Sequence, residues 1–217
     1  MHFAIFAKYW EPGKVKTRLA RKIGNATACK VYVRFFQHLI HRFRCIGDRR
    51  TVVFSPVGSE ALFRKEVPEN WDLAPQAGGD LGNRMKEFFV SNSAEGIKNI
   101  LIGSDTPNLP VEFVDQAFKL LEQVDVVLGP SADGGYYLVG MMEPIDIFDD
   151  VAWSTDQVLP TTLRKLDSIG KTYQLLPELK DVDEFEDLQR LMKELPTSSL
   201  QADQDLFAAL QEVEILV

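Results

Sequence analysis

Two aspartates stand in positions that suit a divalent metal ion. Asp105 follows the apolar segment Asn99 to Ile102. Asp183 is the last residue of a later segment, Asp181-Val182-Asp183. A carboxylate at the end of a strand can bind Mg²⁺ or Mn²⁺, ions that keep several waters and bridge to phosphates. We therefore expect Asp105 to be a metal ligand and a catalytic residue, with Asp183 as the second ligand. The alternatives are a plain turn at Asp105 and a helix N-cap at one member of the later pair.

A basic loop near the start of the chain suits a phosphate. It reads Pro12-Gly13-Lys14-Val15-Lys16-Thr17-Arg18-Leu19 and follows the first apolar segment. Gly13 lets the backbone turn closely around a ligand, and a helical segment follows that can present its N-terminal amides. We expect Gly13, Lys14, Lys16 and Arg18 to bind a nucleotide through its phosphates. It is neither a Walker loop nor a dinucleotide fingerprint, and a solvated basic loop is the alternative.

A glycine-rich segment, Gly78-Gly79-Asp80-Leu81-Gly82-Asn83-Arg84-Met85, opens a later helical pattern. Its glycines let the backbone approach a planar base or a ribose, and Asp80 can accept hydrogen bonds from either. We expect Gly79 and Asp80 to contact the nucleoside. A simple helix N-cap at Asp80 is the alternative.

A second aspartate-glycine segment, Ser131-Ala132-Asp133-Gly134-Gly135-Tyr136-Tyr137, again follows an apolar segment. Gly134 and Gly135 leave room for a substrate, and Asp133 could hold an acceptor hydroxyl or a sugar. We expect Asp133 to be a catalytic residue on the acceptor side. A β-hairpin turn would have much the same sequence.

These motifs need a scaffold that brings several strand ends together. Apolar strands alternate with helical patterns, which predicts an α/β fold with a mostly parallel, doubly wound sheet flanked by helices. The predicted strands are 3–7, 51–55, 73–75, 99–103, 125–129, 136–141 and 172–176. The predicted helices are 26–46, 59–67, 81–91, 111–122, 157–166, 184–195 and 203–213.

The composition is that of a globular protein, with 45% hydrophobic and 26% charged residues among 217. This length suits a single domain over residues 1–217. No apolar run reaches the ~20 residues of a membrane span, and the first residues lack a signal-peptide pattern, so we expect a cytoplasmic protein. The net charge of -8 argues against nucleic-acid binding. Residues 1–50 nevertheless contain 12 Lys or Arg and two acidic residues, so we expect phosphates to bind there.

The order of these motifs along the chain resembles a bacterial family of nucleotide-diphospho-sugar transferases with the Rossmann-like GT-A fold. The chain is more distantly similar to phospholactate guanylyltransferases and molybdenum-cofactor nucleotidyltransferases. The resemblance reaches to about Leu195, and it departs from the family pattern at Trp10 and at Glu184-Phe185. The residues that carry it are Phe6-Ala7-Lys8, Pro12 to Leu19, Gly79 to Gly82, Arg84-Met85, Gly103 to Asp105, Pro107, Leu128 to Pro130, Asp133 to Tyr136, Trp153 to Thr155, Asp181 to Asp183 and Asp187-Leu188.

The resemblance implies a role for each matching residue. Lys16 and Arg18 match the cations on the donor phosphates, and the segment around Asp80 matches the contact with base and ribose. Asp105 matches the metal-binding carboxylate, with Asp183 as its partner. Lys8 and Arg84 lie inside matching motifs and are included in the expected nucleotide-binding set.

Three functions are compatible with these residues. The first is a metal-dependent glycosyltransferase with a nucleotide-sugar donor and an acceptor that the sequence does not identify. The second is a nucleotidyltransferase of the guanylyltransferase kind, in which the acceptor attacks the α-phosphorus and pyrophosphate leaves. The third is a nucleotide-binding module without turnover. The absence of a glycine-rich triphosphate loop after the first strand favours the nucleotide sugar, as does the space at Asp133-Gly134-Gly135.

Overall fold

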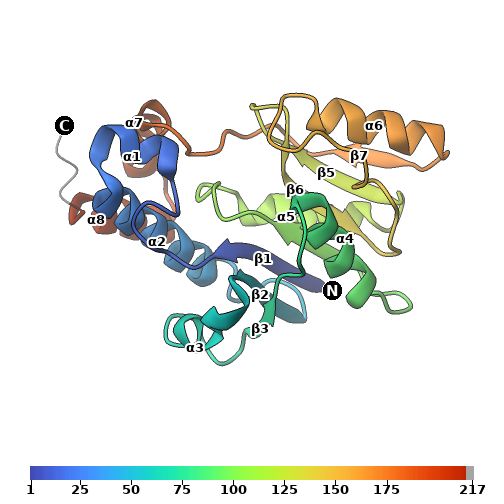
Figure 1. Cartoon of the computed structure of the whole chain (residues 1–217), viewed down its shortest axis with the longest axis horizontal. Coiled ribbons are helices and arrows are strands. Elements are labelled where there is room, and N and C mark those ends of the chain that lie inside the picture. The colour runs from blue at the N-terminus through green and yellow to red at the C-terminus, as the bar shows by residue number, and fades with distance from the viewer. Residues whose placement is uncertain (214–217) are drawn as a thin grey trace.

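A seven-stranded sheet forms the middle of the computed structural model, which describes residues 1–213 (Figure 1). Its strand order is β3-β2-β1-β4-β6-β5-β7. All neighbours pair in parallel except β6, which is antiparallel to β4 and β5, so the predicted mostly parallel sheet is confirmed. The strands are β1 His2–Lys8, β2 Arg49–Ser55, β3 Asp72–Pro75, β4 Asn99–Ile102, β5 Val126–Pro130, β6 Tyr136–Met141 and β7 Tyr173–Leu175.

The helices are α1 Thr17–Ile23, α2 Asn25–Arg42, α3 Glu60–Phe63, α4 Leu81–Ser91, α5 Val111–Leu120, α6 Val158–Ser168, α7 Phe185–Glu194 and α8 Gln201–Gln211. The helices α2 to α8 lie close to the predicted segments, with different ends, and α1 is the helical segment expected after the basic loop. The helix predicted at 26–46 ends at Arg42, and the helix predicted at 59–67 is shortened to α3 after a 3₁₀ turn. The predicted domain extends to residue 217, and residues 214–217 lie outside the described part of the chain.

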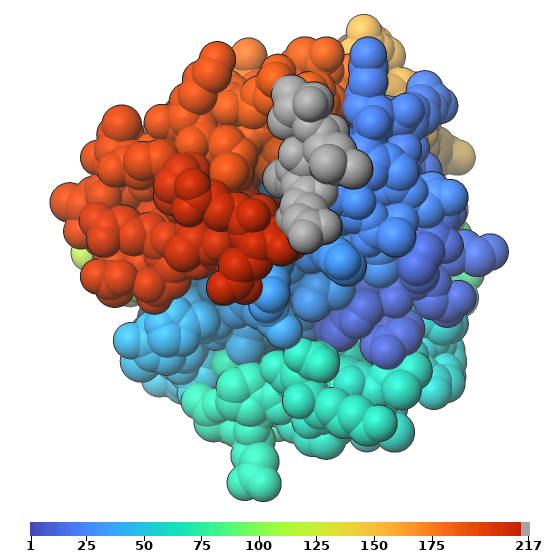
Figure 2. All heavy atoms as spheres, turned by 90° about the vertical axis from the view of Figure 1, so that its left-hand side faces the viewer, coloured from blue at the N-terminus to red at the C-terminus, as the bar shows by residue number. Residues whose placement is uncertain are grey.

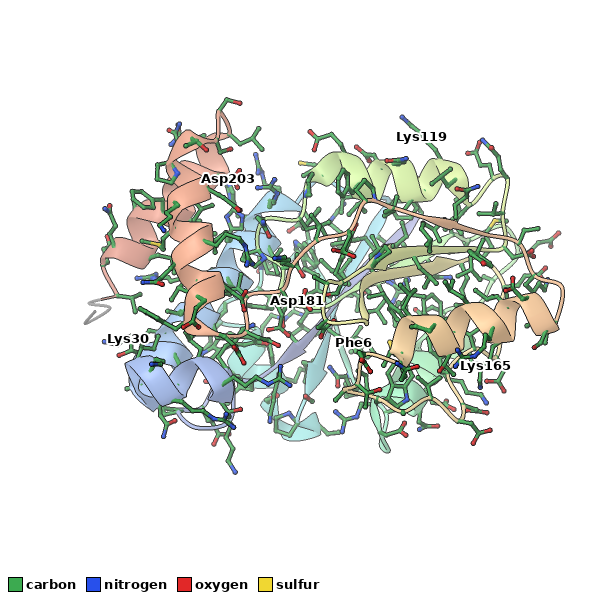
Figure 3. The ribbon with its side chains drawn as sticks, turned by 90° about the horizontal axis from the view of Figure 1, so that it is seen from above. Phe6, Lys30, Lys119, Lys165, Asp181 and Asp203 are labelled. Atoms are coloured by element: carbon green, nitrogen blue, oxygen red, sulfur yellow. The ribbon has the colours of Figure 1, made fainter. Side chains whose placement is uncertain are left out.

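The sheet is buried on both faces because successive side chains of a strand point to opposite sides. In β4, Ile100 and Ile102 pack into one core cluster, whereas Leu101 packs into the other. Residues of α2, α3 and α5 join the first cluster, and residues of α4 and α6 join the second. Figure 3 accordingly shows α5 and α6 on opposite sides of the sheet. The chain therefore forms a single α/β domain with helices on both faces.

A third apolar cluster joins both ends of the chain. Leu19 of α1, Phe35 of α2, Leu188 of α7 and Leu206 of α8 are all buried in it, together with Val182 from the segment before α7. Figure 2 shows these first and last helices packed against each other on one side of the molecule. The cluster fixes the positions of the basic loop before α1 and of the aspartates before α7. No helix within residues 1–213 is long and apolar enough to cross a membrane.

The two departures from the family pattern have local explanations. Trp10 packs against Phe36 and Phe63, with ring centroids 5.1 and 5.3 Å apart, and so holds the first loop against α2. Glu184 forms a capping box with Asp187 at the start of α7. In a capping box each side chain satisfies a backbone N–H that the helix leaves free.

Candidate functional site

A cleft of about 490 Å³ runs along the carboxyl ends of the parallel strands. This is where open α/β sheets place their ligands. Figure 3 shows Phe6 and Asp181 near the middle of the molecule, where the cleft lies. Its lining comes from the loops after β1, β3, β4, β5 and β6 and from the segment before α7, so residues distant in sequence meet there.

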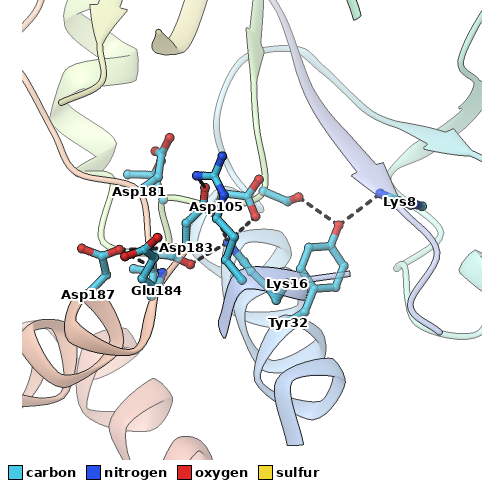
Figure 4. Close-up of polar contacts among 12 residues, drawn as sticks. Lys8, Lys16, Tyr32, Asp105, Asp181, Asp183, Glu184 and Asp187 are labelled. Carbon is cyan, nitrogen blue, oxygen red and sulfur yellow. Dashed lines mark hydrogen bonds and ion pairs between the residues drawn. The ribbon is translucent and has the colours of Figure 1, made fainter. Parts of the chain in front are cut away.

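Lys16 lies at the centre of the polar contacts in this cleft (Figure 4). Its ammonium nitrogen is 2.5 Å from Asp105 Oδ1 and 3.1 Å from Asp183 Oδ1, and it donates to the Val182 carbonyl at 2.7 Å. An ammonium has three hydrogens, and these three oxygens match them. The Lys16 side chain is only 2% exposed, whereas Asp105 and Asp183 are 46% and 37% exposed. The lysine thus approaches the two carboxylates from inside the protein.

Burial alone would lower the pKa of Lys16, because it disfavours the charged form. The charges of Asp105 and Asp183 and their hydrogen bonds outweigh that effect, and the pKa of Lys16 is raised. The lysine is therefore an ammonium ion at neutral pH, and the pair of carboxylates already shares one positive charge.

Backbone geometry holds this group in place. Lys16 is the N-cap of α1 in the left-handed conformation, with φ 47° and ψ 45°, and its carbonyl accepts from the Ala20 N–H at 2.8 Å. The Val182 N–H donates to the Asp105 carbonyl at 2.9 Å, which joins the segment before α7 to the loop after β4. A non-glycine residue in this conformation costs about 1–3 kcal/mol, so the surrounding contacts must stabilise it.

Asp181 is a buried acid beside this group. It accepts hydrogen bonds from Thr106 Oγ1 at 2.5 Å and from Ser131 Oγ at 2.9 Å, and so ties the loops after β4 and β5 to the segment before α7. Burial raises the pKa of Asp181 to about 6, with a further contribution from the charges of Asp105 and Asp133, and the two hydroxyl donors oppose this rise. Asp181 therefore links these three segments, and its burial disfavours the charged form of its carboxyl group.

Tyr32 joins the first strand to the same site from α2. Its hydroxyl accepts from the Lys8 N–H at 3.1 Å and lies 2.9 Å from Ser104 Oγ, next to Asp105. Burial raises the pKa of Tyr32 to about 12, so the hydroxyl stays protonated and can donate to Ser104. This contact fixes the distance between the ends of β1 and β4.

The end of the cleft near β3 carries a fixed cation. Arg84 donates to the Gly79 carbonyl at 3.0 Å and to Gln76 Oε1 at 3.2 Å, and Gln76 in turn donates to the Val53 carbonyl at 3.0 Å. Asp80 is the N-cap of α4, because its carboxylate accepts from the Asn83 N–H at 2.8 Å. This end combines hydrogen-bonding groups that suit a base and ribose.

The other end is a rigid wall beyond β6. Asp133 accepts from the Gly135 N–H at 3.0 Å in the tight turn between β5 and β6, so the hairpin considered from the sequence is present. Gly134 has a φ of 89° and packs directly on the backbone of Asp156. Ser154 in the facing segment also has a positive φ, of 65°. The strain and the close packing hold this wall in one shape.

The structure brings most of the predicted residues together. Seven of them line the cleft, namely Lys8, Lys14, Lys16, Arg84, Asp105, Asp133 and Asp183. Gly13, Gly79 and Asp80 shape the loops around it, and Arg18 lies beside it with its guanidinium 3.6 Å from Asp183 Oδ2. Their roles in binding and catalysis stay predictions.

Several residues that line the cleft are not among the predicted site residues. Gln76 directly follows the predicted strand 73–75, and this position at a strand end is the one feature of the sequence that could have indicated a site residue. Trp153, Ser154 and Thr155 belong to a family motif but were given no role. Tyr32 lies inside a long helix, where nothing in the local sequence distinguishes it from a core residue.

The cleft residues suit a divalent ion that has other ligands besides the protein. Within residues 1–213 no three His, Cys, Asp or Glu side chains form a group that could hold a metal ion by themselves. Mg²⁺ is commonly held by one or two carboxylates together with substrate phosphates, and Asp105 with Asp183 provides such an oxygen pair. The residues present therefore suit an ion that arrives with a phosphate ligand.

The comparisons with known proteins agree with this fold. A solved structure from Desulfovibrio desulfuricans G20, described as a candidate nucleotide-diphospho-sugar transferase, is 32% identical over 97% of this chain and 94% of that chain, with a TM-score of 0.90. A cytidylyltransferase from Leptospira borgpetersenii is 13% identical over 100% of this chain and 97% of that chain, with a TM-score of 0.59. A nucleotidyl transferase from Methanothermobacter has 14% identity, coverage of 91% and 99%, and a TM-score of 0.58.

The two distant structures share the fold alone. No curated protein matches the chain significantly. Residues 40–155 match the family model described as "Uncharacterized protein conserved in bacteria (DUF2064)", and this segment covers more than half of the chain. With the cleft, the sheet order and the Desulfovibrio structure in agreement, the chain belongs to the DUF2064 family and has a nucleotide-diphospho-sugar transferase-like fold.

Proposed function

We propose that the protein is a metal-dependent transferase that uses a nucleotide-diphospho-sugar donor. The observation that carries this proposal is the order of the cleft residues across the sheet, whose strand order is β3-β2-β1-β4-β6-β5-β7. Gln76 and Arg84 follow β3, Asp105 with its partner Asp183 lies at the end of β4, and Asp133 follows β5. This order matches the order of base, diphosphate and sugar in such a donor. The name given to the Desulfovibrio relative supports the same reading.

Each part of the cleft then has a task. Gln76, Arg84 and the Gly79 segment bind the nucleoside, and Lys8, Lys14 and Arg18 attract the diphosphate. Mg²⁺ or Mn²⁺ on Asp105 and Asp183 would neutralise the charge that develops on the leaving diphosphate.

On the acceptor side, Asp133 orients the acceptor hydroxyl. The hydroxyl oxygen bonds to the anomeric carbon, and the bond from that carbon to the diphosphate oxygen breaks. The nucleoside diphosphate leaves, and the hydroxyl proton passes to the Asp133 carboxylate. Catalysis in this scheme is positioning and electrostatic stabilisation.

A panel of nucleotides and nucleotide sugars tests the proposal, first by thermal shift with and without Mn²⁺, because a ligand that binds the folded state raises its stability. Active combinations are then assayed separately for nucleoside diphosphate and for pyrophosphate. We expect nucleoside diphosphate release from one nucleotide sugar. Metal-dependent pyrophosphate release from a triphosphate would instead identify a nucleotidyltransferase.

Asp105→Asn is the matched variant for both assays, since it keeps the volume and removes the charge. We expect it to fold and to lose metal-dependent nucleotide binding. Asp183→Asn should weaken the same binding. Unchanged metal-dependent affinity in Asp105→Asn would show that Asp105 is only a turn residue.

A further inference from the structure

Lys16 lies between the two carboxylates, in the space that a metal ion bound to the same two Oδ1 atoms would occupy. Its ammonium contacts Oδ1 of both Asp105 and Asp183 and is almost fully buried. We propose that Lys16 is a built-in counter-ion that competes with the divalent cation for these carboxylates. The metal ion then binds tightly only together with a phosphate ligand, because the phosphate replaces the carboxylates as the partner of the Lys16 ammonium. This inference rests on the proposed function and concerns the same cleft.

The competition follows from distances. The Lys16 nitrogen lies 2.5 and 3.1 Å from the two oxygens. A Mg²⁺ ion needs its ligand oxygens at about 2.0–2.1 Å, so the ion and the ammonium cannot both occupy the space between them. Two cations side by side would also repel strongly at such separations, most of all in a partly buried site. The ammonium must therefore leave these two oxygens when a metal ion binds to both of them.

Lys16 has few places to go. Its backbone is fixed as the N-cap of α1, and its ammonium is 5.9 Å from the centre of the Phe35 ring, so the stem lies along the third apolar cluster. The open direction is the cleft, which Lys16 lines together with Lys8 and Lys14. An ammonium that turns in that direction loses two carboxylates and needs new oxygens, because a charge left unpaired in a partly buried place is costly.

A bound diphosphate supplies those oxygens. Its oxygens would bind Lys16 together with the exposed cations of the loop. Asp105 and Asp183 would then be free for the metal ion. Metal and phosphate then help each other to bind, and by linkage the effect is the same in both directions. Lys16 would thus balance one of the two carboxylate charges in the free protein and release both carboxylates when the donor is present.

The test measures Mn²⁺ affinity from the electron paramagnetic resonance signal of the free ion. Lys16→Met removes the charge and keeps an apolar stem of similar length. We expect Mn²⁺ alone to bind this variant about tenfold more tightly than the natural protein, or better, which is within the usual range of coupling between sites. Lys14→Met is the matched control, because it removes one positive charge from an exposed position of the same loop and leaves the ammonium between Asp105 and Asp183. Its Mn²⁺ affinity should change less than about threefold.

The second measurement uses preformed Mn²⁺ complexes of the common nucleoside diphosphates. If one of them binds the natural protein, it should bind Lys16→Met more weakly, opposite to the effect on Mn²⁺ alone. If Lys16→Met binds both Mn²⁺ alone and the Mn²⁺ complex more tightly, Lys16 does not move from the carboxylates to the phosphate. If Lys16→Met and the natural protein bind Mn²⁺ alone equally, Lys16 does not compete with the metal ion. Circular dichroism with chelator present checks the fold, and Lys16→Gln, which can still donate to the Val182 carbonyl, replaces the variant if it fails to fold.

The two proposals fail separately. If no nucleoside diphosphate complex binds the natural protein, the proposed function is wrong. The comparison of Mn²⁺ alone on Lys16→Met and Lys14→Met still decides whether Lys16 competes for the carboxylates.

Discussion

Replacing Asp181 by asparagine isolates the cost of burying a carboxyl group in the cleft wall. The pKa of Asp181 is raised to about 6 in the folded protein, first by burial and then by the charges of Asp105 and Asp133. An aspartate in the unfolded chain has a pKa of about 3.9. The folded state therefore holds this proton more tightly, and the stability linked to it is fully present below pH ~4 and lost as the pH rises to ~6.

The size of the effect follows from the pKa difference. Each pKa unit corresponds to about 1.4 kcal/mol, so the carboxylate costs the folded state up to about 3 kcal/mol above pH ~6. About two thirds of that change falls above pH ~4.5, where unfolding is convenient to measure. Asparagine keeps an acceptor oxygen for Thr106 or Ser131 and carries no charge. The variant should therefore gain stability over the natural protein as the pH rises from 4.5 to 7.5.

The assay is urea unfolding across this pH range with a chelator present, so that metal binding does not contribute. The difference between variant and natural protein is the useful quantity, because buried His38 gives an opposite slope. Burial, followed by the charge of Arg42, lowers the pKa of His38 to about 4, so its contribution is present above pH ~6.5 and lost as the pH falls. A stability difference for Asp181→Asn that stays constant from pH 4.5 to 7.5 would refute the reasoning.

Three further predictions concern His38, the cleft wall and the donor loop. His38→Gln should become more stable relative to the natural protein by up to about 3 kcal/mol as the pH falls from ~6.5 to ~4 in the same urea experiment, and a constant difference would mean that the pKa of His38 is not lowered. Gly134→Ala should lose about 2–4 kcal/mol, because its φ is 89° and the new Cβ would lie 2.5 and 2.7 Å from the Asp156 backbone. Gly58→Ala, which meets nothing within 4 Å, should stay within ~0.5 kcal/mol, and similar losses in both would contradict the packing argument. Arg18→Ala should weaken a nucleoside diphosphate about tenfold to hundredfold by calorimetry and leave the nucleoside nearly unaffected, whereas equal losses would indicate a disturbed loop.

Much of the scaffold could be predicted because its signals are local. The runs Ile100 to Ile102 and Val126 to Leu128 are apolar without alternation, which is typical of strands buried on both faces, and both are buried here. The bounds of α1 were harder to predict, although the helix predicted from residue 26 begins at Asn25 as α2. Apolar residues continue through the junction, and only the left-handed backbone of Gly24, with a φ of 80°, separates the two helices.

The composition of the site was predictable from the strand ends, but its pairings were not. Asp105 and Asp183 were singled out because each follows a strand, and they do share the cleft. The position of Lys16 between them depends on packing of Leu19 and Val182 in the third cluster, which no local pattern reveals. The same is true of Asp181, whose raised pKa comes from burial under loops distant in sequence.

The most distant paired strands, β1 and β4, join His2 to Asn99 across 97 residues, whereas the contacts of Lys16 with Val182 and Asp183 span 166 and 167 residues. Contacts between such distant residues carry a larger chain-entropy cost of loop closure than contacts between near ones. During synthesis the ribosome also delivers the segment before α7 long after the loop before α1. The central sheet can therefore be assembled while the cleft still lacks one of its carboxylates. Under the proposed function, a chain that ends before Asp183 would present the proposed nucleoside end of the cleft without the second carboxylate of the proposed metal site, and it would not turn over the donor.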